Sequence, residues 1–101
     1  MAKWADYGIS HVRYNDQRTH IVKVKVREDK GDSLGNAEEW SRSQVVSALD
    51  RGKTFVTILE GSDHKWNRGQ DVHIITVNGT KYIRTDQNQR ASDNLEKLPE
   101  F

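Results

Sequence analysis

The sequence predicts a small α+β domain, in which a mainly antiparallel sheet carries one helix packed on a face. Three observations lead to this fold class. Short runs of β-branched residues recur along the chain, capping residues mark one helix start, and an Asn78-Gly79 turn separates two apolar runs. The predicted element order is β-β-α-β-β-β, and an extended C-terminal strap over residues 86–101 is expected to dock on the body.

The first two predicted elements are strands. One covers Ile9 to Tyr14 and the other covers His20 to Arg27. In the second strand Val22, Val24 and Val26 alternate with basic residues, and successive side chains of a strand point to opposite faces. We therefore expect the three valines to face the core and the basic side chains to face water.

A polar segment over residues 28–39 is predicted to be a loop, and a helix follows it. Ser41 and Gln44 have the spacing of a capping box, in which two free N–H groups at a helix start are satisfied reciprocally. The helix is predicted to run from Arg42 to Arg51. Gly52 then ends it, because glycine adopts the left-handed backbone that closes many helices.

Three more strands are predicted after the helix. The Asn78-Gly79 turn fixes the register of the last two, so His73 is expected opposite Arg84 and Ile75 opposite Tyr82. That side of the hairpin is expected to be only partly covered. The predicted strands cover residues 54–59, 72–77 and 80–85, a polar loop covers 61–71, and the core side of the hairpin carries Val72, Ile74 and Ile83.

Length and composition limit the classes of function. The 101 residues are expected to form one domain with residues 1–8 flexible, and 31% of them are charged. A formal net charge of +1 argues against general polyanion binding, so an anionic partner would need a local patch. The chain has no cysteine, which excludes disulfides, and no stretch approaches membrane-spanning length. A cytoplasmic protein without a membrane partner is the resulting prediction.

No catalytic or metal site is predicted. The histidines His11, His20, His64 and His73 lack the spacing of metal ligands, and the loop glycines Gly31, Gly35, Gly61 and Gly69 do not form a phosphate-binding motif. We therefore predict a protein that is not an enzyme and that binds neither cofactor nor metal.

Nucleic-acid binding is one of two binding hypotheses. Basic side chains are predicted to share the water-facing side of the first hairpin, and the 61–71 loop places a tryptophan between cations, an arrangement suited to stacking on bases. A structural alternative is that lysines protect a strand edge and the tryptophan packs on the sheet. The candidate residues are Arg13, Lys23, Lys25, Arg27, Lys65, Trp66 and Arg68.

The second hypothesis is recognition of a small anionic ligand or nucleotide at the C-terminal hairpin. Arg84 would bind the anion with two parallel hydrogen bonds, Tyr82 would stack on the ligand, and His73 would lie beside them. A structural alternative is that Arg84 pairs with an acid of the strap, such as Asp86 or Asp93.

The end of the chain carries the most specific pattern. Tyr82-Ile83-Arg84-Thr85-Asp86 leads to Ser92-Asp93-Asn94-Leu95 and then to Leu98-Pro99-Glu100-Phe101. This pattern resembles the C-terminal signature of a bacterial family of small uncharacterised proteins. The resemblance extends to a helix start at Trp40-Ser41 and a strand entry at Gly52-Lys53. It implies that Arg84, Asp86, Asp93 and Asn94 with the tail's apolar residues form one unit, and it implies no activity.

The sequence as a whole predicts a small, non-enzymatic binding or accessory module. Nucleic acid and a small anionic ligand are the two candidate partners. A homodimer that uses a free strand edge is a further possibility that the sequence leaves open.

Overall fold

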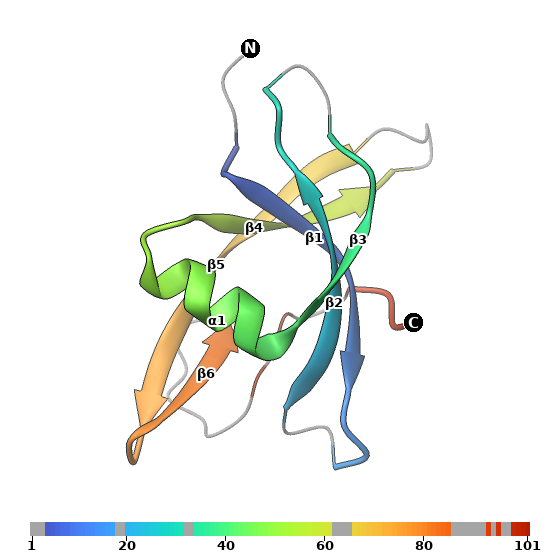
Figure 1. The fold of residues 1–101 in the computed structure, drawn as a ribbon. Helices are drawn as coiled ribbons and strands as arrows, with labels where there is room; N and C mark the ends of the chain where they lie inside the picture. The colour runs from blue at the N-terminus through green and yellow to red at the C-terminus, as the bar shows by residue number, and fades with distance from the viewer. Residues whose placement is uncertain are drawn as a thin grey trace.

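In the computed structural model of the chain, six strands form one curled sheet that packs against a helix (Figure 1). The structure describes residues 4–17, 20–31, 34–61, 66–85, 93, 95 and 98–101. The elements in this part are β1 (Tyr7–Tyr14), β2 (Ile21–Glu28), β3 (Glu38–Ser41), α1 (Arg42–Asp50), β4 (Phe55–Glu60), β5 (Trp66–Val77) and β6 (Thr80–Arg84).

The sheet is mixed. Its strand order is β3-β2-β1-β4-β5-β6. Strands β1 and β4 run parallel, with Tyr7 opposite Phe55 and Ile9 opposite Thr57, while the other neighbouring pairs are antiparallel. The α+β class and the mostly antiparallel character are thus as predicted. The parallel pair was not foreseen, and it arises because helix α1 connects one half of the sheet to the other.

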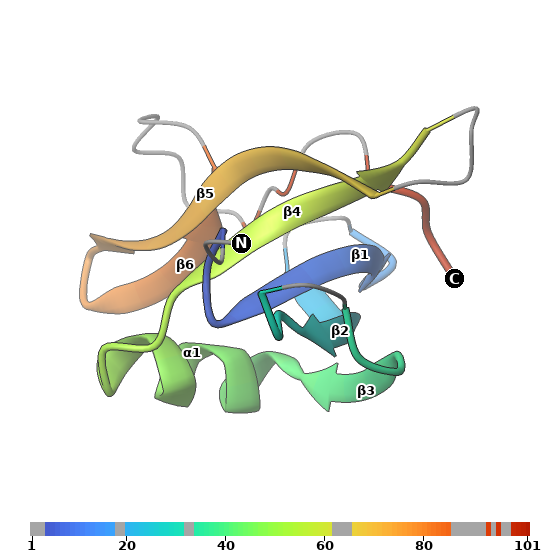
Figure 2. The same ribbon diagram turned by 90° about the horizontal axis from the view of Figure 1, so that it is seen from above.

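The helix closes the hollow side of the curled sheet. Figure 2 shows α1 below the sheet, with β6 above one end of the helix and β3 at the other end. The main core fills the space between helix and sheet, and a smaller cluster of Ala5, Val56 and Ile58 lies elsewhere. Buried members of the main core are Ile9, Val12, Ile21, Val24, Val26, Val45, Phe55, Val72, Ile83, Leu95 and Leu98.

The predicted signals at the helix ends are confirmed. Ser41 Oγ accepts from the Gln44 N–H at 3.3 Å, and the Gln44 side chain accepts from the Ser41 N–H at 2.7 Å. Gly52 has a φ of 90°, in the region that a side chain disfavours. The helix ends at Asp50, one residue before the predicted end.

The first hairpin departs from simple alternation. Arg13 pairs with Lys23 but Tyr14 pairs with Ile21, so Val22 is an extra residue in a bulge. Val22 is 44% exposed, and the prediction that it faces the core is wrong. Ile21 takes the inward position instead, together with Val24 and Val26.

Two predicted loops contain strand. The predicted 28–39 loop ends in the first residues of β3, where Glu38 pairs with Val26 of β2. The predicted 61–71 loop contains the first half of β5, which pairs with β4 from Trp66 onward. Both segments are polar, so their sequences carry no apolar alternation. Hydrogen bonding to a neighbouring strand determines their conformation, and this outweighs local preference.

The register of the last hairpin is as predicted. Ile75 lies opposite Tyr82 and His73 lies opposite Arg84, while Asn78 has the positive φ typical of this turn. The prediction that this side is only partly covered is wrong for β6. Tyr82 is 8% exposed and Arg84 is 2% exposed.

The described residues of the tail lie against β1 and β2. The Val12 N–H donates to the Pro99 oxygen at 3.0 Å, and the Phe101 N–H donates to the Val12 oxygen at 3.1 Å. Leu95 and Leu98 are buried in the main core. Asp86 and Asn94 of the predicted strap lie outside the described residues.

Candidate nucleic-acid interface

A basic face covers the β1–β2 hairpin on the side away from the core. We define the basic face as His11, Arg13, Lys23 and Lys25 together with the ring of Phe101. Arg13 pairs with Lys23 and His11 pairs with Lys25, while the intervening pair, Val12 with Val24, is buried in the core. Because side chains alternate along a strand, the four basic residues share the opposite side of the hairpin.

The Phe101 ring lies among these cations. The Arg13 guanidinium carbon is 4.7 Å from the ring centroid and Lys25 Nζ is 4.9 Å from it. The His11 ring meets it edge-on with a centroid distance of 6.5 Å, and Arg13 Nε donates to the Phe101 backbone oxygen at 2.7 Å. Cation–π contacts and backbone pairing with Val12 therefore hold an aromatic ring within a cluster of positive charge.

Arg27 and Trp66 lie beside this face and have structural partners. The Arg27 guanidinium carbon lies 5.1 Å from the Trp66 ring centroid, and Nη1 donates to the Gly35 oxygen at 3.0 Å. The Trp66 ring packs on the small cluster of Val56 and Ile58. Trp66 therefore packs on the sheet, as the structural alternative predicted, and it also contacts Arg27.

The cations of the basic face differ from other cations of the described residues in their ion pairing. Elsewhere Arg42 pairs with Asp93, Arg68 with Asp71, and Lys81 with Asp50. In the part of the chain that the structure describes, Arg13, Lys23 and Lys25 have no ion-pair partner. Arg68, which was also predicted to bind nucleic acid, therefore differs from Arg13, Lys23 and Lys25, and the predicted Lys65 lies outside the described residues.

The field of these cations acts on His11. Burial is the largest cause that lowers the pKa of His11 below its ordinary value of 6.5, followed by the positive charges of Lys25 and Arg27, while Glu60 opposes the shift. Ser10 Oγ lies 2.8 Å from Nδ1 of His11 and can donate to it when the ring is neutral. A depressed histidine pKa is expected where positive charge is not neutralised.

The predicted ligand residues of the C-terminal hairpin lie together but deep. His73 and Arg84 are cross-strand neighbours, and the Tyr82 ring is 5.4 Å from the His20 ring and 5.9 Å from the Arg42 guanidinium carbon. Asp93, one of the acids suggested for Arg84, pairs with Arg42. The ligand hypothesis for this hairpin remains a prediction, and burial leaves Tyr82 and Arg84 little surface to offer.

Sequence reasoning missed Phe101 and His11 as members of the basic face. The His11-x-Arg13 alternation was a usable signal, because both side chains precede the turn on the same side as the predicted cations. Phe101 gave no such signal, since its position depends on the tail returning to β1. Within the described residues, no group of three His, Asp or Glu side chains is placed to hold a metal ion.

Comparison with known proteins identifies a family and no activity. A family model described as a protein of unknown function, DUF3892, matches residues 8–99. No curated protein and no solved structure matches the chain. No helix of the described residues has the length and apolar character needed to cross a membrane.

Proposed function

The chain belongs to the DUF3892 family of unknown function, and we propose that it is a small module that binds single-stranded nucleic acid on its basic face. In this proposal the protein is bacterial and cytoplasmic and is not an enzyme. The single observation that carries it is a cluster of three cations, Arg13, Lys23 and Lys25, that have no ion-pair partner among the described residues, with the Phe101 ring in contact with Arg13 and Lys25.

Charge and ring have different roles in the proposed complex. Phosphates bind the cations and release condensed counterions, which makes affinity fall as salt rises. Unpaired bases stack on aromatic rings and on the planes of arginine side chains, and this is the usual means of holding single strands. Arg13 and Phe101 offer both surfaces, whereas Lys23 and Lys25 supply charge.

The test is the salt dependence of oligonucleotide binding, measured by fluorescence anisotropy with a labelled mixed-sequence single strand. Wild type is compared with Lys23→Gln, Lys25→Gln and the control Lys81→Gln, which removes the same charge at a residue paired with Asp50. Each basic-face variant is expected to reduce the slope of log affinity against log salt by about 0.7, because one phosphate contact is lost.

Three results would contradict the proposal. One is an equal loss in all three variants, which would indicate a response to net charge rather than to this face. Another is saturable binding whose slope is unchanged in Lys23→Gln and Lys25→Gln. Absence of binding at low salt would also count against the proposal.

A further inference from the structure

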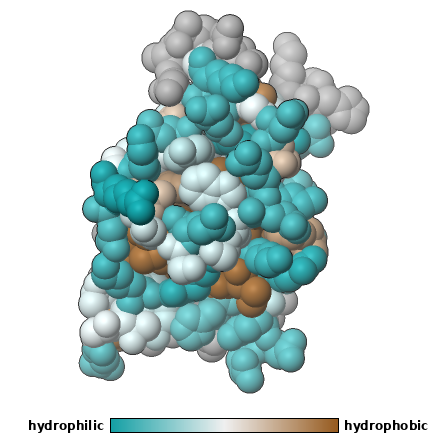
Figure 3. All heavy atoms as spheres, viewed as in Figure 1, coloured by the Kyte–Doolittle hydropathy of each residue, from teal (hydrophilic) through white to brown (hydrophobic). Residues whose placement is uncertain are grey.

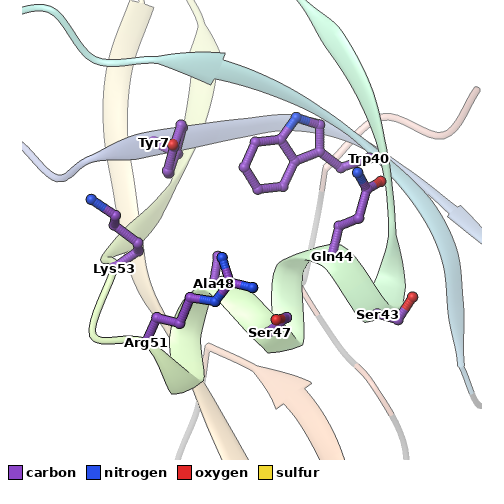
Figure 4. Close-up of a pocket in the computed structure, with 8 residues that line it drawn as sticks. All are labelled: Tyr7, Trp40, Ser43, Gln44, Ser47, Ala48, Arg51 and Lys53. Carbon is purple, nitrogen blue, oxygen red and sulfur yellow. The ribbon is translucent and has the colours of Figure 1, made fainter.

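A hollow lies between α1 and the strands β1 and β3, on the side of the sheet opposite the basic face. Its volume is about 420 Å³, within the range of small-molecule sites. Figure 4 shows aromatic rings on its sheet side and helix side chains on the facing side. The residues that line it are Tyr7, Trp40, Ser43, Gln44, Ser47, Ala48, Arg51 and Lys53.

The sheet side of the hollow is a rigid aromatic wall. The Tyr7 and Trp40 ring centroids lie 4.9 Å apart with a tilt of 59°. Both rings rest on Phe55, which stacks on Tyr7 at 5.1 Å and meets Trp40 edge-on at 5.8 Å. Phe55 is itself buried in the core, so the two rings are held in place from behind. A flat ligand ring would therefore meet a preformed surface.

The helix side leaves these rings uncovered. Ser47 and Ala48 are small, so the helix does not fill the space in front of Trp40. Gln44 extends toward Trp40 in Figure 4. Its amide oxygen already accepts from the Ser41 N–H, which fixes the side chain and leaves the amide NH₂ as a donor to a ligand.

Positive charge stands at one end of the hollow. Arg51 and Lys53 line it, no acidic residue does, and neither cation has an ion-pair partner among the described residues. The helix ends here, but its last carbonyls accept from the backbone N–H groups of Arg51, Gly52 and Lys53. This bonding satisfies the carbonyls of Ser47, Ala48 and Leu49, and the charge that would hold an anion here comes from Arg51 and Lys53.

We infer that this hollow binds a nucleoside monophosphate. The aromatic base would stack against Trp40 and Tyr7, and the phosphate would lie between Arg51 and Lys53. The inference is independent of the proposed nucleic-acid interface, since Tyr7 and the helix lie on the core side of the sheet and the basic face lies on the other.

The test is a titration of the full chain with AMP, followed by the NMR signals of the Trp40 indole and of the Arg51 and Lys53 amides. Adenosine and inorganic phosphate are titrated in parallel, because each carries one half of the proposed recognition. AMP is expected to bind at least about tenfold more tightly than either. Equal affinity for AMP and adenosine, or shifts confined to His11 and the basic face, would overturn the inference.

Two variants sharpen the test. Arg51→Gln with Lys53→Gln is expected to weaken AMP binding about tenfold, whereas the charge-matched control Lys30→Gln with Lys81→Gln is not. Ser47→Leu places an apolar side chain in front of the rings and is expected to abolish AMP binding. Ser47 is an exposed residue of α1, so the variant is expected to remain folded. Retained binding in Ser47→Leu would overturn the inference. Oligonucleotide binding is measured on the same samples. It shows whether a negative AMP result concerns the hollow alone or whether the proposed nucleic-acid interface also fails.

Discussion

His11 is the residue at which the electrostatics of the basic face can be observed directly. Its imidazole is partly buried beside Lys25 and Arg27, and both burial and charge lower its pKa below 6.5. A phosphate backbone bound across Lys25 would neutralise the field that opposes protonation. The proposed function therefore requires the His11 pKa to rise when nucleic acid binds.

We expect the His11 pKa, measured by NMR titration, to be below 6.5 in the free protein and to increase on addition of a single-stranded oligonucleotide. Since the folded pKa is lowered, the unfolded state binds more protons between the two pKa values. The His11 contribution to stability is thus present above about pH 6.5 and is lost as the pH falls through the folded pKa. His11→Gln should lose less stability between pH 7 and pH 5 than wild type. A folded pKa above 6.5 would contradict both expectations.

At the scale of elements, the sequence predicted correctly those features that depend on residues close together in the chain. The capping box of Ser41 and the Asn78-Gly79 turn depend on residues close in sequence, and both were correct. Strand β3 and the first half of β5 are defined by pairing with β2 and β4, which their own polar residues do not indicate, and the segments that contain them were taken for loops. The bulge at Val22 was missed for the same reason, because a bulge is defined by the strand that it faces.

The test at this scale lies in β5, where Val56 pairs with Asp71 but Ile58 pairs with Arg68, so β5 has an extra residue in a bulge opposite Thr57. A Cβ on Gly69 would lie 2.1 Å from Thr57 Oγ1 and 3.0 Å from the Thr57 backbone oxygen, so Gly69→Ala must move β4 and β5 apart. We expect a loss of about 2 kcal/mol in the free energy of unfolding, measured with urea. Gly35→Ala is the control, because its nearest atoms would be at 3.5 Å or more. Equal stability of the two variants would indicate that the Thr57 contact is not restrictive.

At the scale of the whole molecule, neighbourhoods built from distant segments were beyond sequence reasoning. Alternation predicted the cations on β2, but the ring among them comes from the end of the chain. The hollow beside α1 was not predicted because Tyr7 of β1, Trp40 of β3 and Arg51 after α1 are brought together only by the curl of the sheet. On the face seen in Figure 3, apolar surface appears only in small areas between hydrophilic side chains, so this view shows no broad apolar docking surface.

The same curl leaves β2 and β6 facing each other, and Asp93 joins them. Its carboxylate accepts from the Ile21 N–H of β2 and the Ile83 N–H of β6, each at 2.7 Å, and from Arg42 Nε at 2.7 Å. The two backbone N–H groups and Arg42 Nε can act only as donors, and the Asp93 carboxylate is fully buried. A side chain at position 93 with only one acceptor oxygen could not accept hydrogen bonds from Ile21, Ile83 and Arg42 in the same way.

Asp93→Asn is therefore expected to lower the free energy of unfolding by about 3 kcal/mol in a urea titration, because its amide NH₂ would face a donor and Arg42 would lose its partner. Asp71→Asn is the matched control, since Asp71 also binds an arginine but its side chain is 73% exposed. Exposed pairs contribute little, so the control should stay within about 0.5 kcal/mol of wild type. If Asp93→Asn were equally mild, β2 and β6 would be held together by the packing of Leu95 and Leu98, and the Asp93 carboxylate would be dispensable.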